Sequence, residues 1–183
     1  MMGERLAFQK KNGQKIAGKA YFAGVDKKYP TVIFAHGFGS NYRDLEHHGA
    51  GFAESGINCI FFDFCGGGLK SLSDGKMTQM TVLTEAEDLT EVISQVQQME
   101  NEKTLAGKGV KAEDLDYVMF KVSKLVDDKT TFEKAAEKYL KENPRFTAGN
   151  SYRMTSSSGG NSNGSGGNVN ASINDAIRMA ARR

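Results

Sequence analysis

An apolar run that ends in a glycine turn is the part of this sequence most suited to chemistry. Residues 32–35 read Val-Ile-Phe-Ala, and the turn that follows is His36-Gly37-Phe38-Gly39. Glycines let a loop bring bare backbone N–H groups close to a ligand oxygen, and such donors stabilise the negative charge that develops when an acyl carbonyl is attacked. The turn is therefore a candidate oxyanion hole, although a glycine turn that only connects strand to helix is the alternative. We expect the Phe38 N–H to be the donor, supported by the loop residues His36, Gly37 and Gly39.

A second glycine loop follows a second apolar run. Residues 57–64 are too densely apolar for a strand wetted on one face, which predicts a strand buried between two layers. The residues that we expect to shape the loop after it are Asp63, Gly66, Gly68 and Ser71. Lys70 and Ser71 resemble the end of a phosphate-binding loop, but Leu69 stands where that motif requires glycine. Nucleotide binding is therefore not favoured, and a tight loop at the sheet edge is the simpler interpretation.

Together the two loops resemble a known enzyme family. Residues 18–99 resemble the N-terminal half of an α/β-hydrolase of the serine esterase and acyl-aminopeptidase group, and most closely the bacterial cinnamoyl or feruloyl esterases. The motifs that carry this resemblance are residues 36–40, 41–48 and 61–68, with Ser71, Ser73, Asp74 and Gly75. In that family the first loop supplies one oxyanion N–H, which falls here on Phe38, and the second shapes the sheet edge. The resemblance implies a small acyl ester or amide as substrate, with no cofactor and no metal.

The catalytic groups that such an enzyme needs are not found in a usable form. The family requires a serine in a Gly-x-Ser-x-Gly turn between a strand and a helix, followed by an acid and a histidine. The one match, residues 160–164, lies in a Ser/Gly/Asn tract with no strand before it. The three histidines, His36, His47 and His48, all precede any such turn, and a serine without a base is a poor nucleophile. We therefore expect no complete catalytic set, and a chain that is inactive alone.

The other reactive side chains are weaker candidates. His47 and His48 are adjacent, so on a helix they would point about 100° apart, which disfavours a shared metal or a displaced base. Cys59 has the setting of a core residue, and Cys65 has no evident activating partner. Two cysteines form no disulfide framework, so we expect both to be reduced. We expect His36 to be structural rather than a base.

Alternating strand and helix patterns position the two loops. Strands are expected at residues 18–24, 31–35 and 57–64, and helices at residues 45–53 and 82–96; Gly56 ends the first helix, and Thr81 or Thr84 caps the second. This order is the βαβ signature of an α/β fold. We predict a truncated α/β-hydrolase sheet, mostly parallel and with helices on its faces, followed by a helical tail with a disordered Ser/Gly/Asn linker.

The character of the sequence changes beyond about residue 99. The expected segments are the N-terminal half of an α/β-hydrolase domain at residues 1–99, a polar junction at 100–111, a two-helix segment at 112–147, a flexible Ser/Gly/Asn-rich linker at 148–171 and a short basic C-terminal helix at 172–183. Within the two-helix segment, the apolar spacing predicts helices at residues 112–127 and 130–142, ended by Asn143-Pro144. One hypothesis, based on their apolar faces, is that these helices cover the open edge of the sheet.

The C-terminal part weakly resembles the capsid scaffolding and minor structural proteins of tailed phages. The likeness rests on the two helices, the Ser/Gly/Asn tract and an end that contains Arg178, Arg182 and Arg183. An arbitrary helical tail is the alternative. The resemblance implies a non-enzymatic protein whose basic C-terminal helix binds a protein partner. The chain as a whole has the pattern of a chimera, whether a natural fusion, a misassembled reading frame or an engineered fusion.

Composition limits the remaining function classes. The 183 residues carry a net charge of +2, which gives no electrostatic reason to bind nucleic acid or a membrane. No apolar run approaches the roughly 18 residues of a membrane span, and the first residues lack the apolar core of a signal peptide, so we expect a cytoplasmic protein. Three functions stay open: a serine hydrolase by descent, a scaffold-like interaction protein, or a non-catalytic binder of small ligands beside Phe38 and Gly39.

Overall fold

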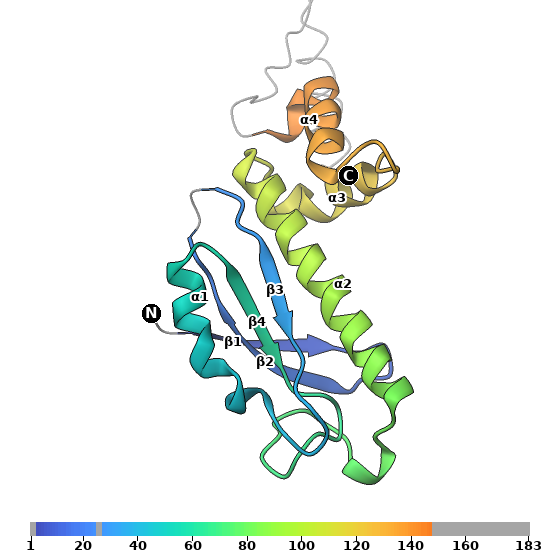
Figure 1. Cartoon of the computed structure of the whole chain (residues 1–183). Coiled ribbons are helices and arrows are strands. Elements are labelled where there is room, and N and C mark those ends of the chain that lie inside the picture. The colour runs from blue at the N-terminus through green and yellow to red at the C-terminus, as the bar shows by residue number, and fades with distance from the viewer. Residues whose placement is uncertain (1–2, 25–26, 148–183) are drawn as a thin grey trace, which may run out of the picture. The chain divides into compact units, whose positions relative to one another are not determined.

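A four-stranded mixed sheet forms the centre of the fold (Figure 1). The computed structural model describes residues 3–24 and 27–147. The strands are β1 (Glu4–Gln9), β2 (Lys15–Tyr21), β3 (Thr31–Phe34) and β4 (Asn58–Phe62), arranged in the order β1-β2-β4-β3. The α/β class is as predicted, but the expectation of a mostly parallel sheet is wrong. Only β3 and β4 pair in parallel, whereas β1–β2 and β2–β4 are antiparallel.

Chain connectivity explains this mixture of directions. A tight turn joins β1 to β2. In this turn Gly13 has a φ of +88°, and its N–H donates a hydrogen bond of 3.0 Å to the Lys10 carbonyl oxygen. A turn this short can only reverse the chain, so the two strands are antiparallel. By contrast, β3 and β4 are joined through α1 (Gly49–Glu54), and a helical crossover brings the second strand back parallel to the first.

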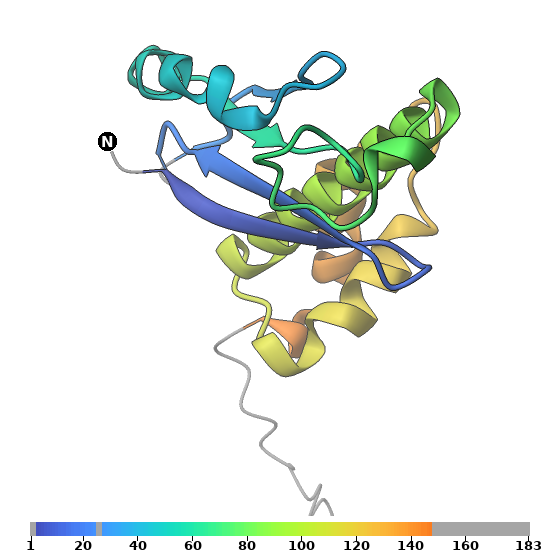
Figure 2. The same ribbon diagram turned by 90° about the horizontal axis from the view of Figure 1, so that it is seen from below.

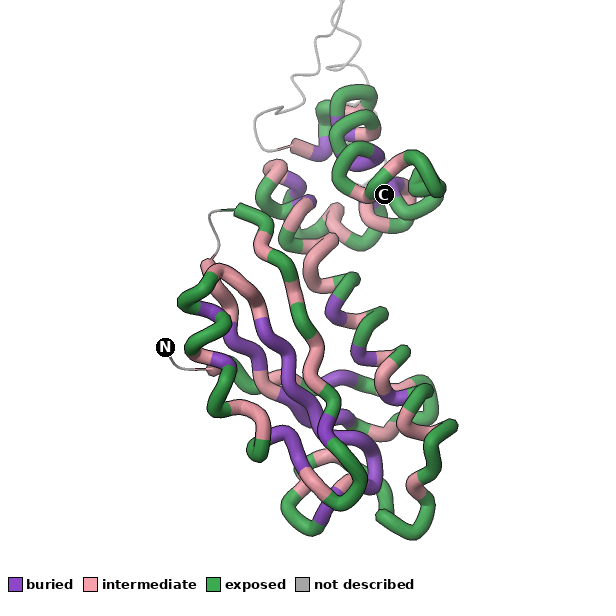
Figure 3. The backbone as a smooth tube through the Cα atoms, viewed as in Figure 1, coloured by how far each residue is buried: buried purple, intermediate pink, exposed green. Residues whose placement is uncertain are grey.

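Helices cover both faces of the sheet. Helix α1 lies on one side and α2 (Val82–Gly107) on the other (Figure 2). Strand β4 alternates between them: Ile60 and Phe62 pack with Val92 of α2, whereas Phe61 packs with Ala53 of α1. The strand is therefore buried on both faces, as its apolar density predicts, and it lies within the purple centre of Figure 3.

Two predicted helix boundaries are confirmed, the start of α2 and the end of α1. Thr81 caps α2, and the side chains of Thr81 and Thr84 each accept a hydrogen bond from the backbone N–H of the other. Gly56 follows α1 with a φ of +82°, a left-handed conformation that glycine adopts without strain. Helix α2 is longer than expected, because residues 100–107 of the predicted junction form its last turns.

A second, smaller core lies at the far end of α2. Leu105 of α2 is buried there with side chains from α3 (Leu115–Ser123) and α4 (Phe132–Glu142). Of the helix predicted at residues 112–127, residues 115–123 form α3, and α4 ends just before Pro144 as predicted. The expectation that these helices cover the sheet edge is wrong, since their apolar faces pack on α2 and on each other. Among the described strands, β3 pairs only with β4, so its second edge has no strand partner.

Part of the predicted organisation lies outside the described residues. This applies to the linker at residues 148–171 and to the basic helix at residues 172–183. Within residues 3–24 and 27–147, no helix is both long enough and apolar enough to cross a membrane.

Candidate functional site

The two glycine loops lie together at the carboxyl ends of strands β3 and β4. Strands β3 and β4 are parallel, so the loops that follow them leave from the same edge. The fully buried carboxylate of Asp63 joins the two loops: Oδ1 accepts the Tyr42 N–H at 2.6 Å and Oδ2 accepts the Leu72 N–H at 3.0 Å. Loop residues far apart in the sequence are thereby fixed by one side chain.

His36 is held in the first loop by two backbone contacts. Its Nε2 accepts the Phe64 N–H at 3.2 Å, and its Nδ1 lies 2.9 Å from the carbonyl oxygen of Gly37. A ring that accepts at Nε2 and donates at Nδ1 is a neutral imidazole with both nitrogens in use. The Asp63 carboxylate is 3.8 Å from Nε2, beyond hydrogen-bonding distance. In this geometry His36 positions the loop and has no free nitrogen to act as a base.

Glycine is required where the two loops touch. A Cβ atom on Gly68 would lie 2.4 Å from the Gly39 carbonyl oxygen, and one on Gly66 would lie 2.6 Å from that of Lys76. Gly39 and Gly66 also have φ angles of +74° and +79°, which disfavour other residues. The Gly68 N–H donates to the Ser40 carbonyl oxygen at 3.1 Å, so the second loop supports the first.

The Ser71 hydroxyl accepts a hydrogen bond inside the second loop. Its acceptor oxygen receives the Ser73 N–H at 3.1 Å, while the Ser71 N–H donates to the Gly68 carbonyl oxygen at 2.8 Å. The Ser73 hydroxyl donates to the Asp63 carbonyl oxygen at 2.6 Å. These bonds connect Asp63, Gly68 and Ser71, while the Gly66 N–H donates to the Asp74 carbonyl oxygen at 2.9 Å.

The backbone N–H of Phe38 is at the tip of the supported loop. The turn is closed by a hydrogen bond of 3.1 Å from the Ser40 N–H to the Gly37 carbonyl oxygen. Among the described residues, the Phe38 N–H has no hydrogen-bond partner. Its side chain is 73% exposed, and Leu69 on the neighbouring loop is fully exposed. An unpartnered donor therefore lies beside apolar side chains at the edge where the two loops meet.

No metal site accompanies this donor in the described part of the chain. Residues 3–24 and 27–147 contain no group of three or more metal-ligating side chains. The rings of His47 and His48 lie 3.8 Å apart, but two ligands alone do not make a structural metal site. Both cysteines are free thiols, and both are buried.

We expect both thiols to resist iodoacetamide in the folded protein at pH 8. Burial, with a further contribution from the Asp88 carboxylate, raises the pKa of Cys65 to about 11, and burial also raises the pKa of Cys59. The thiolate is the reactive form, and at pH 8 only about one Cys65 thiol in a thousand is ionised. Mass spectrometry should show no adduct on the native protein and two on the urea-unfolded control. Rapid native labelling of Cys65 would show instead that its thiol is activated.

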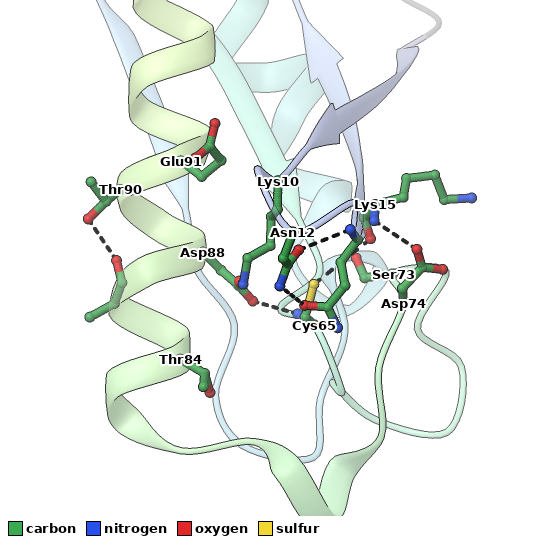
Figure 4. A network of polar contacts seen from close by, with 12 residues as sticks. Lys10, Asn12, Lys15, Cys65, Ser73, Asp74, Thr84, Asp88, Thr90 and Glu91 are labelled. Carbon is green, nitrogen blue, oxygen red and sulfur yellow. Dashed lines mark hydrogen bonds and ion pairs between the residues drawn. The ribbon is translucent and has the colours of Figure 1, made fainter.

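One buried ion pair was missed by the sequence analysis. Asp88 of α2 is fully buried, its Oδ1 pairs with the Lys10 ammonium, and its Oδ2 accepts the Cys65 N–H at 2.7 Å (Figure 4). Burial lowers the pKa of Lys10, but the hydrogen bond and charge of Asp88 outweigh it, so the net shift is upward. The signal was present: Asp88, Val92 and Val96 repeat every four residues, which places an acid on the apolar face of α2.

The loops also complete the hydrogen bonding of β2. The Asp74 carboxylate accepts the Lys15 N–H at 2.7 Å (Figure 4). The Ser73 hydroxyl accepts the Ala17 N–H at 2.8 Å. Side chains of the second loop therefore replace strand partners at the start of β2. This contact fixes the loop to the sheet as well as to the neighbouring loop.

Comparison with known proteins gives partial matches to solved structures. No family model matches the sequence, and no curated protein matches it. An esterase from Exiguobacterium antarcticum aligns at 28% identity over 51% of this chain and 32% of its own, with a TM-score of 0.42. A Butyrivibrio proteoclasticus protein solved with bound ferulic acid aligns at 22% identity over 49% and 36%, with a TM-score of 0.44.

A third match covers more of the chain at lower identity. An α/β-hydrolase from a Penicillium species aligns at 15% identity over 79% of this chain and 66% of its own, with a TM-score of 0.47. The chain thus spans about a third of the length of the first two structures. The TM-scores of these three matches are all below 0.5, so functional inference rests on the loop geometry of this chain.

Proposed function

We propose that the two loops form the oxyanion half of an acyl-transfer site of the α/β-hydrolase type. The observation that carries this proposal is the Phe38 N–H, which has no partner in the described residues although the loop around it is firmly held. A preorganised donor of this kind stabilises a developing oxyanion without reorganising at the moment of reaction. Small acyl esters or amides are the substrates that this chemistry implies.

We further infer that these 183 residues do not catalyse hydrolysis alone. No histidine follows His48, and the match at residues 160–164 lies outside the described residues. Without a base, a serine hydroxyl is not activated at neutral pH. The serine, acid and histidine would therefore come from residues outside these 183. The second edge of β3 supports this, because no described strand pairs with it and an open edge can accept an added strand.

Two measurements test these statements separately. First, the purified chain is mixed with 4-nitrophenyl butyrate, with and without a serine-directed fluorophosphonate. We expect no turnover above the buffer rate and no fluorophosphonate adduct. Turnover that the fluorophosphonate abolishes would show that the chain carries a complete catalytic set.

Second, amide NMR spectra are recorded while ethylphosphonate is added as an oxyanion mimic. We expect the Phe38 amide to shift most. The Gly51 amide of α1 serves as the internal control, because a Cβ built on Gly51 would have no atom within 4 Å. Equal shifts at Phe38 and Gly51 would contradict the oxyanion proposal. A C-terminal esterase fragment that supplies serine, acid and histidine should then restore hydrolysis, whereas the same fragment with its serine replaced by alanine should not.

A further inference from the structure

A cavity lies at the amino ends of β3 and β4, the opposite end of these strands from Phe38. Its volume is about 510 Å³, and it is lined by Thr31 and Asn58, the first residues of β3 and β4, and by the second half of α2. This volume falls within the range of small-molecule sites, about 300–1,000 Å³. The cavity is therefore large enough for a ligand, and it is separate from the two glycine loops.

One wall of the cavity is apolar. Ile60 of β4 and Val96 of α2 line it and are 1% and 7% exposed, and Phe22 and Met99 extend the same surface. Both of the latter pack against the main core, so they are anchored. A fixed apolar wall favours a hydrocarbon or aromatic body, since burying such a surface gains about 25 cal/mol per Å².

The lining also carries positive charge. It includes four lysines, Lys27, Lys28, Lys103 and Lys108. Lys108 pairs with Glu137 at 2.9 Å, but the other three have no ion pair with any described carboxylate. The Lys103 ammonium lies 3.9 Å from the centre of the Phe22 ring, which places its charge against the apolar wall.

The acidic lining residues compensate only part of this charge. They are Glu100 and Glu133, and Glu100 already accepts the Thr31 hydroxyl at 2.5 Å. Four lysines against two glutamates leave the lining with a net charge of +2, counted over the same lining residues. Like charges gathered around an apolar surface are stabilised by an anion, and more so where water is partly excluded.

We infer that this cavity binds an organic anion with an apolar body, such as a medium-chain or aromatic carboxylate. The apolar wall would contact the body, and the lysine ammonium groups would contact the carboxylate. This inference is independent of the proposed acyl-transfer site, because the two share no residue.

Calorimetry with octanoate and octanol tests the inference on the full chain. The two probes share an alkyl body and differ in charge, so octanoate should bind at least tenfold more tightly if the lysines contribute. Amide shifts on addition of octanoate should centre on residues 99–107 of α2 and leave Phe38 unchanged. Equal affinity for the two probes, or shifts centred on Phe38, would overturn the inference.

Charge variants locate the binding site. The double variant Lys28→Gln and Lys103→Gln should weaken octanoate binding about tenfold and leave octanol binding unchanged. Lys111→Gln is the matched control, because that lysine is exposed, lies outside the cavity and pairs with Glu113. Both substitutions in the double variant are on exposed side chains, and circular dichroism confirms that the variants are folded. Equal octanoate affinity in the double variant and the control would refute the assignment.

Discussion

Replacing Gly68 with alanine is expected to lower the free energy of unfolding by about 3 kcal/mol, the upper end for overpacked sites. The added Cβ would lie 2.4 Å from the Gly39 carbonyl oxygen and 2.9 Å from that of Ser40. Both contacts are with backbone, so no side-chain rotation relieves them. The loop that carries Phe38 must move, and we expect the Phe38 amide resonance to shift even without a ligand.

Gly51→Ala is the matched control for this prediction. Gly51 lies in α1, and a Cβ there would meet nothing within 4 Å. Alanine is the better helix former, so this variant should be stabilised by up to about 1 kcal/mol. Urea denaturation followed by circular dichroism measures both variants. If Gly68→Ala is as stable as Gly51→Ala, the close approach of the two loops is not a constraint on the fold.

The variant Asp88→Ala is expected to lose about 3–5 kcal/mol of stability, the usual effect of removing one partner of a buried ion pair. Two groups lose their acceptor at once: the Lys10 ammonium, whose side chain is 11% exposed, and the Cys65 N–H. Urea denaturation gives the difference in unfolding free energy. Since Asp88 connects α2 to the β1–β2 turn and to the second loop, the loss should affect the whole sheet rather than one segment.

Glu87→Ala is the control for this prediction, because it removes a carboxylate from α2 without breaking the buried ion pair. Glu87 is exposed one position away on the same helix, so its replacement should change stability by no more than about 0.5 kcal/mol. A second comparison adds Lys10→Met to Asp88→Ala, which removes the unpaired ammonium and should recover part of the stability. Equal losses in the Glu87 and Asp88 variants would show that the buried pair has no special energetic weight.

The same pair makes the fold sensitive to alkali. The folded-state pKa of Lys10 lies above its ordinary value of 10.5, so the stabilisation by its charge is complete below about that pH and is lost as the pH rises through the folded value. The Cys65 thiol acts in the same direction: its pKa is raised from 9.0 to about 11, so the unfolded state gains from ionisation between these values.

Local sequence patterns were sufficient for the elements in the middle of the fold. Strands β3 and β4 and helix α2 were predicted because each has a dense or strictly periodic apolar pattern, and the cap at Thr81 because of its residue type. Strand β1 was missed because residues 4–9 place only Leu6 and Phe8 as large apolar side chains among polar neighbours. Without β1, the glycine at position 13 could not be recognised as part of a hairpin turn, so the antiparallel half of the sheet was not predicted.

The candidate site could be predicted in part for a similar reason. The glycines of both loops were recognisable from composition and from their position after apolar runs. The contacts that fix them were not, because Asp63 bonds to Tyr42 and Asp88 to Lys10, and these partners are 21 and 78 residues apart. Residue types indicate which side chains can accept a hydrogen bond, but only the folded topology determines which donors reach them.

The position of β4 in the sheet has a consequence for the order of folding. It is the last of the described strands in the sequence, yet it lies between β2 and β3. The β1–β2 hairpin needs only its own short turn and can form as soon as residue 21 is synthesised, whereas β3 has no strand neighbour until residues 58–62 arrive. Contacts between segments distant in the chain form slowly. Insertion of β4 beside the preformed hairpin is therefore the step that should set the folding rate, and the unpaired hairpin is the species exposed to aggregation until that step is complete.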